Sequence, residues 1–438
     1  MRSKLAIGAV LAASISTVSS QACDPGTAHL LGGNWYCSAV QAITYTNVGS
    51  SGTYNEIVSM NGGSCSSRPK AYSGPLAPLN EEVSWHFRGP INLKQFAYYS
   101  LGSGAGSDSY NKREVRPSIH ERRHHGHQHL HKRANDKRAV GDMVTATING
   151  QVVSWVNQYA GGAPPPAPTP APASPPVEGT EGTEGTKYPT KDPSPIFDPG
   201  AGNWGRQGYY NSAGGQADGL VFLNHHGGDK SGVFDYALGN SLSYASTDGC
   251  NGAASPMILA DKLLPDNKEI VIMTDKPCNG DCGTVRPGTV AYHGFDGDSK
   301  LFLTEFSMPN TGKTGWNEDM PAAWILNAAI PRTLQYGKPE CSCWISGCGE
   351  FDVFEVLDAG NPRAKSTLHG NRSGGDSHWF PRPTSKTLKL AVLFDGAANS
   401  VNIRILDDSF EFKPTLDGSE IAAMLAEKVE SASTFAVV

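Results

Sequence analysis

Three acidic residues stand inside one apolar run of this chain. Glu350, Asp352 and Glu355 are interleaved with Phe and Val between Gly349 and Asp358. The β-branched and aromatic residues around them predict a strand in the interior of a sheet. Carboxylates are costly in such surroundings unless they are solvated or paired. The pattern therefore indicates acids that have a chemical task.

The spacing of the acids suggests what that task is. On a regular strand Glu350 and Asp352 share a face, whereas Glu355 falls on the opposite one. A β-bulge of one residue returns Glu355 to the face of Glu350. A retaining glycosidase needs two carboxylates that flank one bond, one as nucleophile and the other as acid and then base. Asp352 between them would help to separate their pKa values. The alternative interpretation is an ordinary edge strand with exposed acids.

The sequence E-F-D-V-F-E resembles the E-x-D-x-x-E signature of glycoside hydrolase family 16, the β-jelly-roll laminarinases and wall-glucan enzymes. Residues 320–326 resemble the W-P-A-x-W-x-L strand that precedes the signature, with Met320 in place of the first Trp. Residues 367–370 resemble the strand with a His that follows it. The resemblance implies these roles: nucleophile Glu350, assisting residue Asp352, acid/base Glu355.

The whole chain is similar to a family of fungal cell-wall proteins that join a glycine-rich N-terminal module to a family-16-like C-terminal module. Members of that family are described as endo-β-1,3-glucanases, so the resemblance implies a secreted cell-wall enzyme that acts on β-glucan. Two other functions stay open. One is a wall transglycosylase with the same carboxylates, in which a sugar hydroxyl replaces water. The other is a non-catalytic glucan-binding or structural wall protein.

The 438 residues are enough for two domains and a linker. Residues 1–20 have the basic start and short apolar run of a secretory signal. Residues 21–160 predict a small, glycine-rich β domain that an insertion at 103–138 interrupts. Residues 161–195 are a Pro-, Thr- and Gly-rich linker. Residues 196–438 would form the family-16-like domain.

Short apolar runs separated by Gly, Asn and Asp fill the second domain. The clearest of these runs are 220–223, 269–273, 301–306, 388–394 and 400–406. Runs of this kind predict a sandwich. We therefore expect an all-β protein, with a C-terminal β-jelly-roll sandwich, a smaller β-rich N-terminal domain and a Pro-rich linker. The helix that we predict, at 419–428, either docks on the outer face of the sandwich or frays.

The insertion at 103–138 is basic and rich in histidine. It contains six of the 13 histidines, which suits either a metal-binding tract or a solvated loop. The loop is favoured because no carboxylate or cysteine pattern fixes a geometry. Dibasic pairs at 132–133 and 137–138 predict cleavage of the precursor. Residues 112–138 hold nine Lys or Arg and three acids, a net of +6, so a total of −6 leaves −12 for the remainder. An acidic body argues against a nucleic-acid partner.

Nine cysteines in an oxidising compartment predict disulfides. Six of them lie in the second domain and allow three bridges, while three early ones leave one thiol unless it pairs elsewhere. We expect Cys341, Cys343 and Cys348 to pin the turn ahead of the acids, with a zinc site as the alternative. Asn371 begins the one N-glycosylation sequon. Outside the signal, no apolar run approaches the length of a membrane span.

Polysaccharide clefts place aromatic faces against sugar rings and polar groups against hydroxyls. Trp324 occupies a family position and is our first candidate for such contacts, followed by His369 and Trp379. A structural role is the alternative for each of them, and for Trp344 core packing is favoured. We predict no metal, no cofactor, β-glucan as partner and a monomer. The glucan linkage and the role of the N-terminal module stay open.

Overall fold

The computed structural model describes residue 23 and residues 27–102, 143–148, 151–156 and 202–438. The chain falls into two compact units, of which the larger combines residues 1–108 with 193–438. In the smaller unit, the described residues are the hairpin of β8 (Met143–Ile148) and β9 (Gln151–Val156). The predicted signal, His-rich insertion, dibasic pairs and linker lie outside the described residues. Among those residues, no helix is long and apolar enough to span a bilayer.

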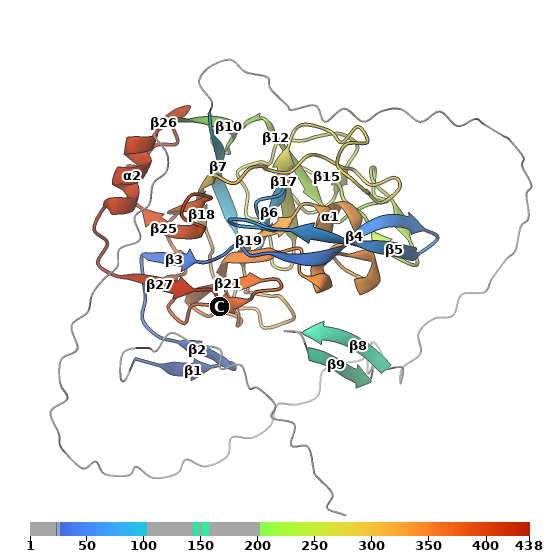
Figure 1. The fold of residues 1–438 in the computed structure, drawn as a ribbon, viewed down its shortest axis with the longest axis horizontal. Helices are drawn as coiled ribbons and strands as arrows, with labels where there is room; N and C mark the ends of the chain where they lie inside the picture. Colours follow the sequence, from blue (N-terminus) through green and yellow to red (C-terminus); the bar gives the residue numbers. More distant parts are fainter. Residues whose placement is uncertain (1–22, 24–26, 103–142, 149–150, 157–201) are drawn as a thin grey trace, which may run out of the picture. The chain divides into compact units, whose positions relative to one another are not determined.

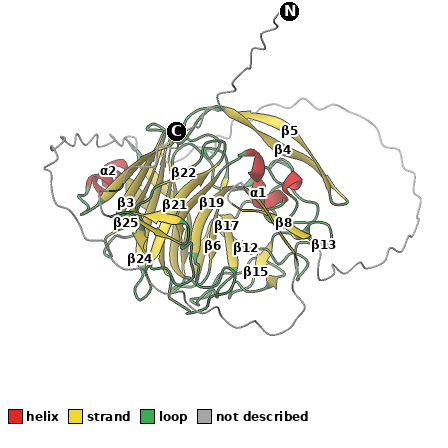
Figure 2. Ribbon diagram, turned by 90° about the horizontal axis from the view of Figure 1, so that it is seen from below, coloured by secondary structure: helices red, strands yellow, loops and turns green. Residues whose placement is uncertain are grey.

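Two large sheets form the body of the larger unit (Figures 1 and 2). The nine-stranded sheet has the order β11 (Gln216–Asp218), β10 (Asn203–Asn211), β7 (Asn92–Leu101), β18 (Lys300–Ser307), β24 (Leu388–Asp395), β25 (Ser400–Leu406), β3 (Ala42–Thr46) and β27 (Ala432–Ala436), with β26 (Thr415–Asp417) paired to β10. The ten-stranded sheet has the order β16 (Gly252–Ala253), β15 (Ser243–Ala245), β12 (Leu220–Asn224), β17 (Glu269–Thr274), β6 (Val83–Arg88), β19 (Ala322–Asn327), β20 (Glu350–Glu355), β21 (Arg363–His369) and β22 (Gly374–Gly375), with β23 (Phe380–Pro381) paired to β21.

Smaller elements surround these sheets. The remaining strands of the larger unit form three hairpins: β1 (His29–Leu31) with β2 (Asn34–Tyr36), β4 (Gly52–Asn61) with β5 (Ser64–Tyr72), and β13 (Phe234–Asp235) with β14 (Gly239–Asn240). The helices are α1 (Ala329–Thr333), α2 (Gly418–Ala426) and the 3₁₀ turns η1 (Pro339–Cys341) and η2 (Trp344–Ser346). All five predicted apolar runs are strands in the two sheets, because each supplies side chains to a buried face.

The facing sides of the two sheets enclose the main hydrophobic core. Trp85 of β6 packs against Phe96 of β7 and Phe302 of β18, with ring centroids 5.6 and 5.1 Å apart. Phe351 and Phe354 of β20 point into the same core. Tilted and edge-on aromatic pairs add about 0.5–1.5 kcal/mol each to the burial of their area. The predicted all-β sandwich is therefore confirmed.

Each sheet is also covered on its outer face. The helix α2 packs Ile421 and Met424 against Leu301 of the nine-stranded sheet, and Asp417 with Glu420 forms a capping box at its start. The predicted helix therefore docks rather than frays. On the other sheet, the β4–β5 hairpin and α1 lie over the start of β20, in a cluster that buries Trp324. Figure 2 shows α1 beside β4 and far from α2.

The N-terminal strands belong to the sandwich itself. Strand β7 lies between β10 and β18 in one sheet, and β6 lies between β17 and β19 in the other. This corrects the predicted division into a separate N-terminal domain and a sandwich at 196–438. Sequence order suggested two domains because a long Pro- and Gly-rich segment separates the two stretches. Backbone hydrogen bonds join the N-terminal stretch to the C-terminal one instead. β6 and β7 pair on both of their edges with strands from residues 203–327, so they cannot form a separate domain.

Four disulfides occur among the described residues: Cys23–Cys37, Cys65–Cys341, Cys278–Cys282 and Cys343–Cys348. The pair Cys343–Cys348 confirms the expected clamp just ahead of Glu350. Cys65 is the early thiol that pairs elsewhere, with Cys341 at the end of η1. Cys250 is free, so the second domain does not contain the three internal bridges that its six cysteines allow.

We expect residues 202–438 expressed alone to lack a cooperative thermal unfolding transition. Without β6 and β7, each sheet would lose an interior strand and the core would lose Trp85 and Phe96. Co-expression of residues 27–102 as a second chain should restore the transition, measured by circular dichroism. A cooperative transition for 202–438 alone, with the melting temperature of the full chain, would contradict this account.

Candidate active site

The three acids of β20 share one face of the ten-stranded sheet because the strand contains a bulge. Trp324 pairs with Asp352, and Ala323 pairs with Phe354, so Val353 is an extra residue without a partner across the strand pair. A register shift at the same place separates Asp352 from Glu355 in the pairing with β21. The bulge expected from the sequence is therefore present. It turns all three carboxylates away from the core that holds Phe354.

The neighbouring strand β21 supplies a cation to this face. His369 lies opposite Glu350 in the strand register. Its Nε2 donates a hydrogen bond to Asp352 Oδ2 at 2.9 Å. The sequence placed His369 near the cleft, and the structure brings it beside Asp352.

Arg88 of β6 reaches the same face from the other side of β19. Its guanidinium donates to Glu355 Oε1 at 3.1 Å and, through Nε, to the carbonyl of Met320 at 2.9 Å. The second bond fixes the direction of the first. Arg88 could not be predicted from the sequence, because the segment that contains it reads as part of a separate domain.

Trp344 holds the remaining acid. Its indole Nε1 donates to Glu350 Oε2 at 2.5 Å, while 37% of the residue stays exposed. The Cys343–Cys348 disulfide brackets this turn, and Ser346 Oγ accepts from the backbone N–H of Asn55 on β4 at 2.9 Å. Core packing was favoured for Trp344 from the sequence, and the structure corrects that prediction. The flanking cysteines were the signal that the turn is held in place.

Burial and mutual repulsion raise the pKa values of the two glutamates. Burial, followed by the charge of Asp352, raises the pKa of Glu350 to about 8 and that of Glu355 to about 7. His369 behaves differently: burial acts to lower its pKa, but the hydrogen bond and charge of Asp352 outweigh this and raise it to about 9. At neutral pH the site therefore retains a proton on the glutamates, and His369 is an imidazolium. Such shifts are typical of groups that transfer protons.

The two other predicted sugar contacts lie differently. Trp324 is on the correct face, but it is only 4% exposed and its ring stacks on His86 at 5.0 Å, so little of it is free to touch a sugar. Trp379 donates from Nε1 to the Cys37 carbonyl at 3.3 Å and lies 5.0 Å from the Arg363 guanidinium. These contacts place Trp379 beside the chain that follows the β1–β2 hairpin. An exposed aromatic residue that contacts an acid of β20 is Trp344 instead.

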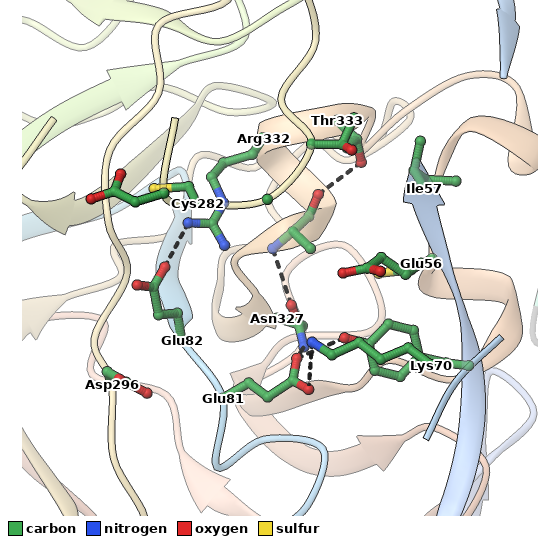
Figure 3. Close-up of a pocket in the computed structure, with 16 residues that line it drawn as sticks. Glu56, Ile57, Lys70, Glu81, Glu82, Cys282, Asp296, Asn327, Arg332 and Thr333 are labelled. Carbon is green, nitrogen blue, oxygen red and sulfur yellow. Dashed lines mark hydrogen bonds and ion pairs between the residues drawn. The ribbon is translucent and has the colours of Figure 1, made fainter. Parts of the chain in front are cut away.

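A polar cavity of about 310 Å³ adjoins the start of β20. Its lining includes Asn327, whose backbone N–H donates to the Gly349 carbonyl at 3.0 Å, and Cys343. Inside it, Glu81 accepts from Asn327 and pairs with Lys70, as Figure 3 shows. The three acids of β20 are not among its lining residues. Glu81 and Glu82 are already paired with Lys70 and Arg332, so neither is free for chemistry.

Two groups of described side chains bring three potential metal ligands within 4.8 Å of one another. The first contains Cys282, which is bonded to Cys278 and so is no free thiolate. The second group is His86, His225 and Glu269. His86 Nδ1 lies 2.9 Å and His225 Nε2 lies 3.3 Å from Glu269 Oε1. The contacts of the two imidazoles with the carboxylate account for this group without an ion.

Comparison with known proteins identifies the family. The C-terminal model of the cell wall protein YJL171C/Tos1 family matches residues 202–424, and the N-terminal model of that family matches residues 41–101. An Arthroderma benhamiae protein named "Probable circularly permuted 1,3-beta-glucanase" is 46% identical over 444 residues, which cover 97% of each chain. The chain belongs to the YJL171C/Tos1 cell wall protein family. The resemblance found in the sequence and the predicted cell-wall location are therefore confirmed.

Two further relatives support the same family assignment. The Candida albicans and Saccharomyces cerevisiae proteins named "Probable circularly permuted 1,3-beta-glucanase TOS1" are each 38% identical to this chain. The first alignment covers 90% of this chain and 92% of the relative, and the second covers 92% and 93%. No solved structure matches the chain.

The raised pKa of Glu350 makes the stability of the fold depend on pH. An unfolded chain loses this proton near 4.5, whereas the folded site holds it to about 8. Rising pH across this window therefore favours the unfolded chain, and the loss is complete above about pH 8. Glu350→Gln removes the loss, so we expect the variant to gain on the order of 5 kcal/mol over the wild type between acidic and alkaline pH.

Chemical unfolding at a series of pH values measures this difference. Glu340→Gln, which changes an exposed acid in η1, is the matched control and should follow the wild type throughout. A stability difference between Glu350→Gln and wild type that stays constant with pH would contradict the assignment of the shifted proton.

Proposed function

We propose that this protein hydrolyses β-1,3-glucan of the cell wall with retention of anomeric configuration. Glu350 is the nucleophile, Glu355 is the acid and then the base, and Asp352 assists. The observation that carries the proposal is the bulge at Val353, which sets the two glutamates on one face with the aspartate between them. The names of the relatives, which specify 1,3-β-glucanase, support the substrate.

The first step breaks the glycosidic bond. A carboxylate oxygen of Glu350 attacks the anomeric carbon, while Glu355 gives its proton to the departing glycosidic oxygen. The raised pKa of Glu355 suits an acid. Because the pKa of Glu350 is raised further, the reactive form of the coupled pair is the one in which Glu350 is ionised and the shared proton lies on Glu355. The products are a covalent glycosyl-enzyme and a shortened glucan with a free hydroxyl.

The second step releases the sugar. Glu355, now ionised, takes a proton from a water molecule whose oxygen attacks the same carbon, and Glu350 leaves as a carboxylate. Arg88 stabilises the ionised Glu355 between the steps, since it donates to that carboxylate. Trp344 and the His369 cation do the same for Glu350 and thereby offset its desolvation.

The location of this activity follows from the family and the sequence. The signal at residues 1–20 directs the protein out of the cell, and endo-type cleavage of glucan there would remodel the wall.

Asn371 of the sequon already donates from Nδ2 to the Thr53 carbonyl and to the Tyr72 hydroxyl, both at 2.9 Å. A sugar at Asn371 would have to replace those contacts. The protein acts as a monomer on a polysaccharide partner.

We expect Glu355→Gln to lower kcat on long β-1,3-glucan oligosaccharides roughly 10²- to 10⁴-fold, because a positioned acid–base contributes about that factor. Glu350→Gln should lower kcat by at least the same factor. Mass-resolved product analysis measures both, and NMR of the first products should show the β anomer. An exposed-acid variant, Glu340→Gln, is the control.

Other outcomes of that experiment point to the two alternatives. Products longer than the substrate would move the assignment to a transglycosylase. Unchanged substrate with the wild type, on β-1,3- and mixed-linkage glucans alike, would favour a binding or structural wall protein and refute the hydrolase.

Trp344→Phe should keep the aromatic surface and remove the hydrogen bond to Glu350. A bond to a charged group contributes about 1.5–3 kcal/mol, so we expect kcat to fall roughly 10- to 100-fold. The acidic limb of the pH profile should also move to higher pH, because the indole favours the ionised carboxylate. Trp316→Phe is the control, since Trp316 is 77% exposed on a loop. An increase in KM alone would show that Trp344 acts only as a sugar platform.

A further inference from the structure

A buried carboxylate lies on the same sheet face, away from the three acids. Glu269 stands opposite Arg88 in the register of β17 and β6, and Arg88 bonds Glu355 on that face. Residues directly opposite in an antiparallel pair point to the same side. Glu269 therefore shares the face of the candidate active site. Three strand spacings separate β17 from β20, which is about 14 Å.

Several donors converge on Glu269. His86 Nδ1 and Gln335 Nε2 each donate to Oε1 at 2.9 Å. Tyr336 donates its hydroxyl to Oε2 at 2.7 Å. Burial acts to raise the pKa of Glu269, but the imidazoles of His225 and His86 outweigh it and hold the pKa below its usual value. The carboxylate is thus a fixed anchor that the hydrolytic steps do not use.

Glu269 holds the exposed aromatic ring of Tyr336 in place. Tyr336 is 57% exposed although its hydroxyl is tied to the sheet. His225 meets the ring edge-on, with centroids 5.3 Å apart and an interplanar angle of 71°. An aromatic ring held in this way loses little conformational freedom on binding. Tyrosine also combines an apolar face with a polar tip, which suits contact with a sugar ring.

We propose that Tyr336 is the platform of a distal glucan-binding subsite, aligned by Glu269 and its histidines. This inference rests on the proposed function, because the ligand is a β-1,3-glucan chain that also crosses the acids of β20. The chain would run across the strands, from the acids of β20 toward Tyr336 beside β17. His86 links the two ends, since it bonds Glu269 and stacks on Trp324. The subsite would favour long substrates and cleavage within the chain.

The test is isothermal titration of a β-1,3-linked glucose hexasaccharide into the full-length Glu350→Gln protein, with and without Tyr336→Ala. Aromatic contacts of this type correspond to about 3- to 10-fold in affinity, so we expect a loss of that size. Tyr336→Phe, which keeps the ring and loses the anchor, should lie between. Tyr236→Ala is the matched control, because Tyr236 is a 96% exposed tyrosine near β13.

The outcomes separate this inference from the proposed function. Equal affinity with and without Tyr336→Ala, together with normal turnover by the wild type, would overturn the subsite and leave the hydrolase standing. Loss of affinity with Tyr336→Ala and no loss with Tyr236→Ala supports the subsite even if turnover is absent. A Glu350→Gln protein that binds no hexasaccharide overturns both the subsite and the substrate. Thermal melting of each variant confirms that the fold is intact.

Discussion

A single extra residue in β20 determines where the three acids of this strand lie. Val353 has no partner across the strand, so the strand gains one position between Asp352 and Glu355. If β20 paired regularly instead, strict alternation would point Glu355 into the core, on the side of Phe351 and Val353. A lone ionised carboxylate there would be several kcal/mol too costly to keep. The bulge thus places the acids in one site and also protects the core.

Collecting three acids on one buried face creates a problem of its own. Their repulsion and desolvation raise the pKa values of both glutamates. Each acid is then held by a donor from a different element: the Trp344 turn for Glu350, β21 for Asp352 and β6 for Glu355. The site therefore exists only when these elements pack together. This explains why disulfides and a hairpin contact fix a short turn that contributes one indole.

Local patterns in the sequence predicted most of what is local in the structure. The bulge followed from the spacing of acids among apolar residues. The three cysteines ahead of the acids predicted a pinned turn, although not which of them pair. What failed depends on pairing between distant segments. Arg88 comes to Glu355 because β6 inserts between β17 and β19, and nothing within residues 83–88 encodes that partner. Trp324 was expected to be exposed and is buried, because the β4–β5 hairpin, which is distant in sequence, covers it. Trp344 was expected to be buried and is partly exposed.

The long segment between the two halves of the sandwich begins and ends at one place. Strand β7 ends at Leu101, which pairs with Trp204 near the start of β10. The intervening residues therefore close a loop between adjacent strands, and the cost of such a loop grows only slowly with its length. The predicted cleavage at 132–133 or 137–138 would leave both sheets complete. The two pieces would stay joined by the β7–β10 and β7–β18 ladders, by β6 in the other sheet, and covalently by Cys65–Cys341. Arg88 and Glu355 would then lie on different polypeptides, and the site would still be whole.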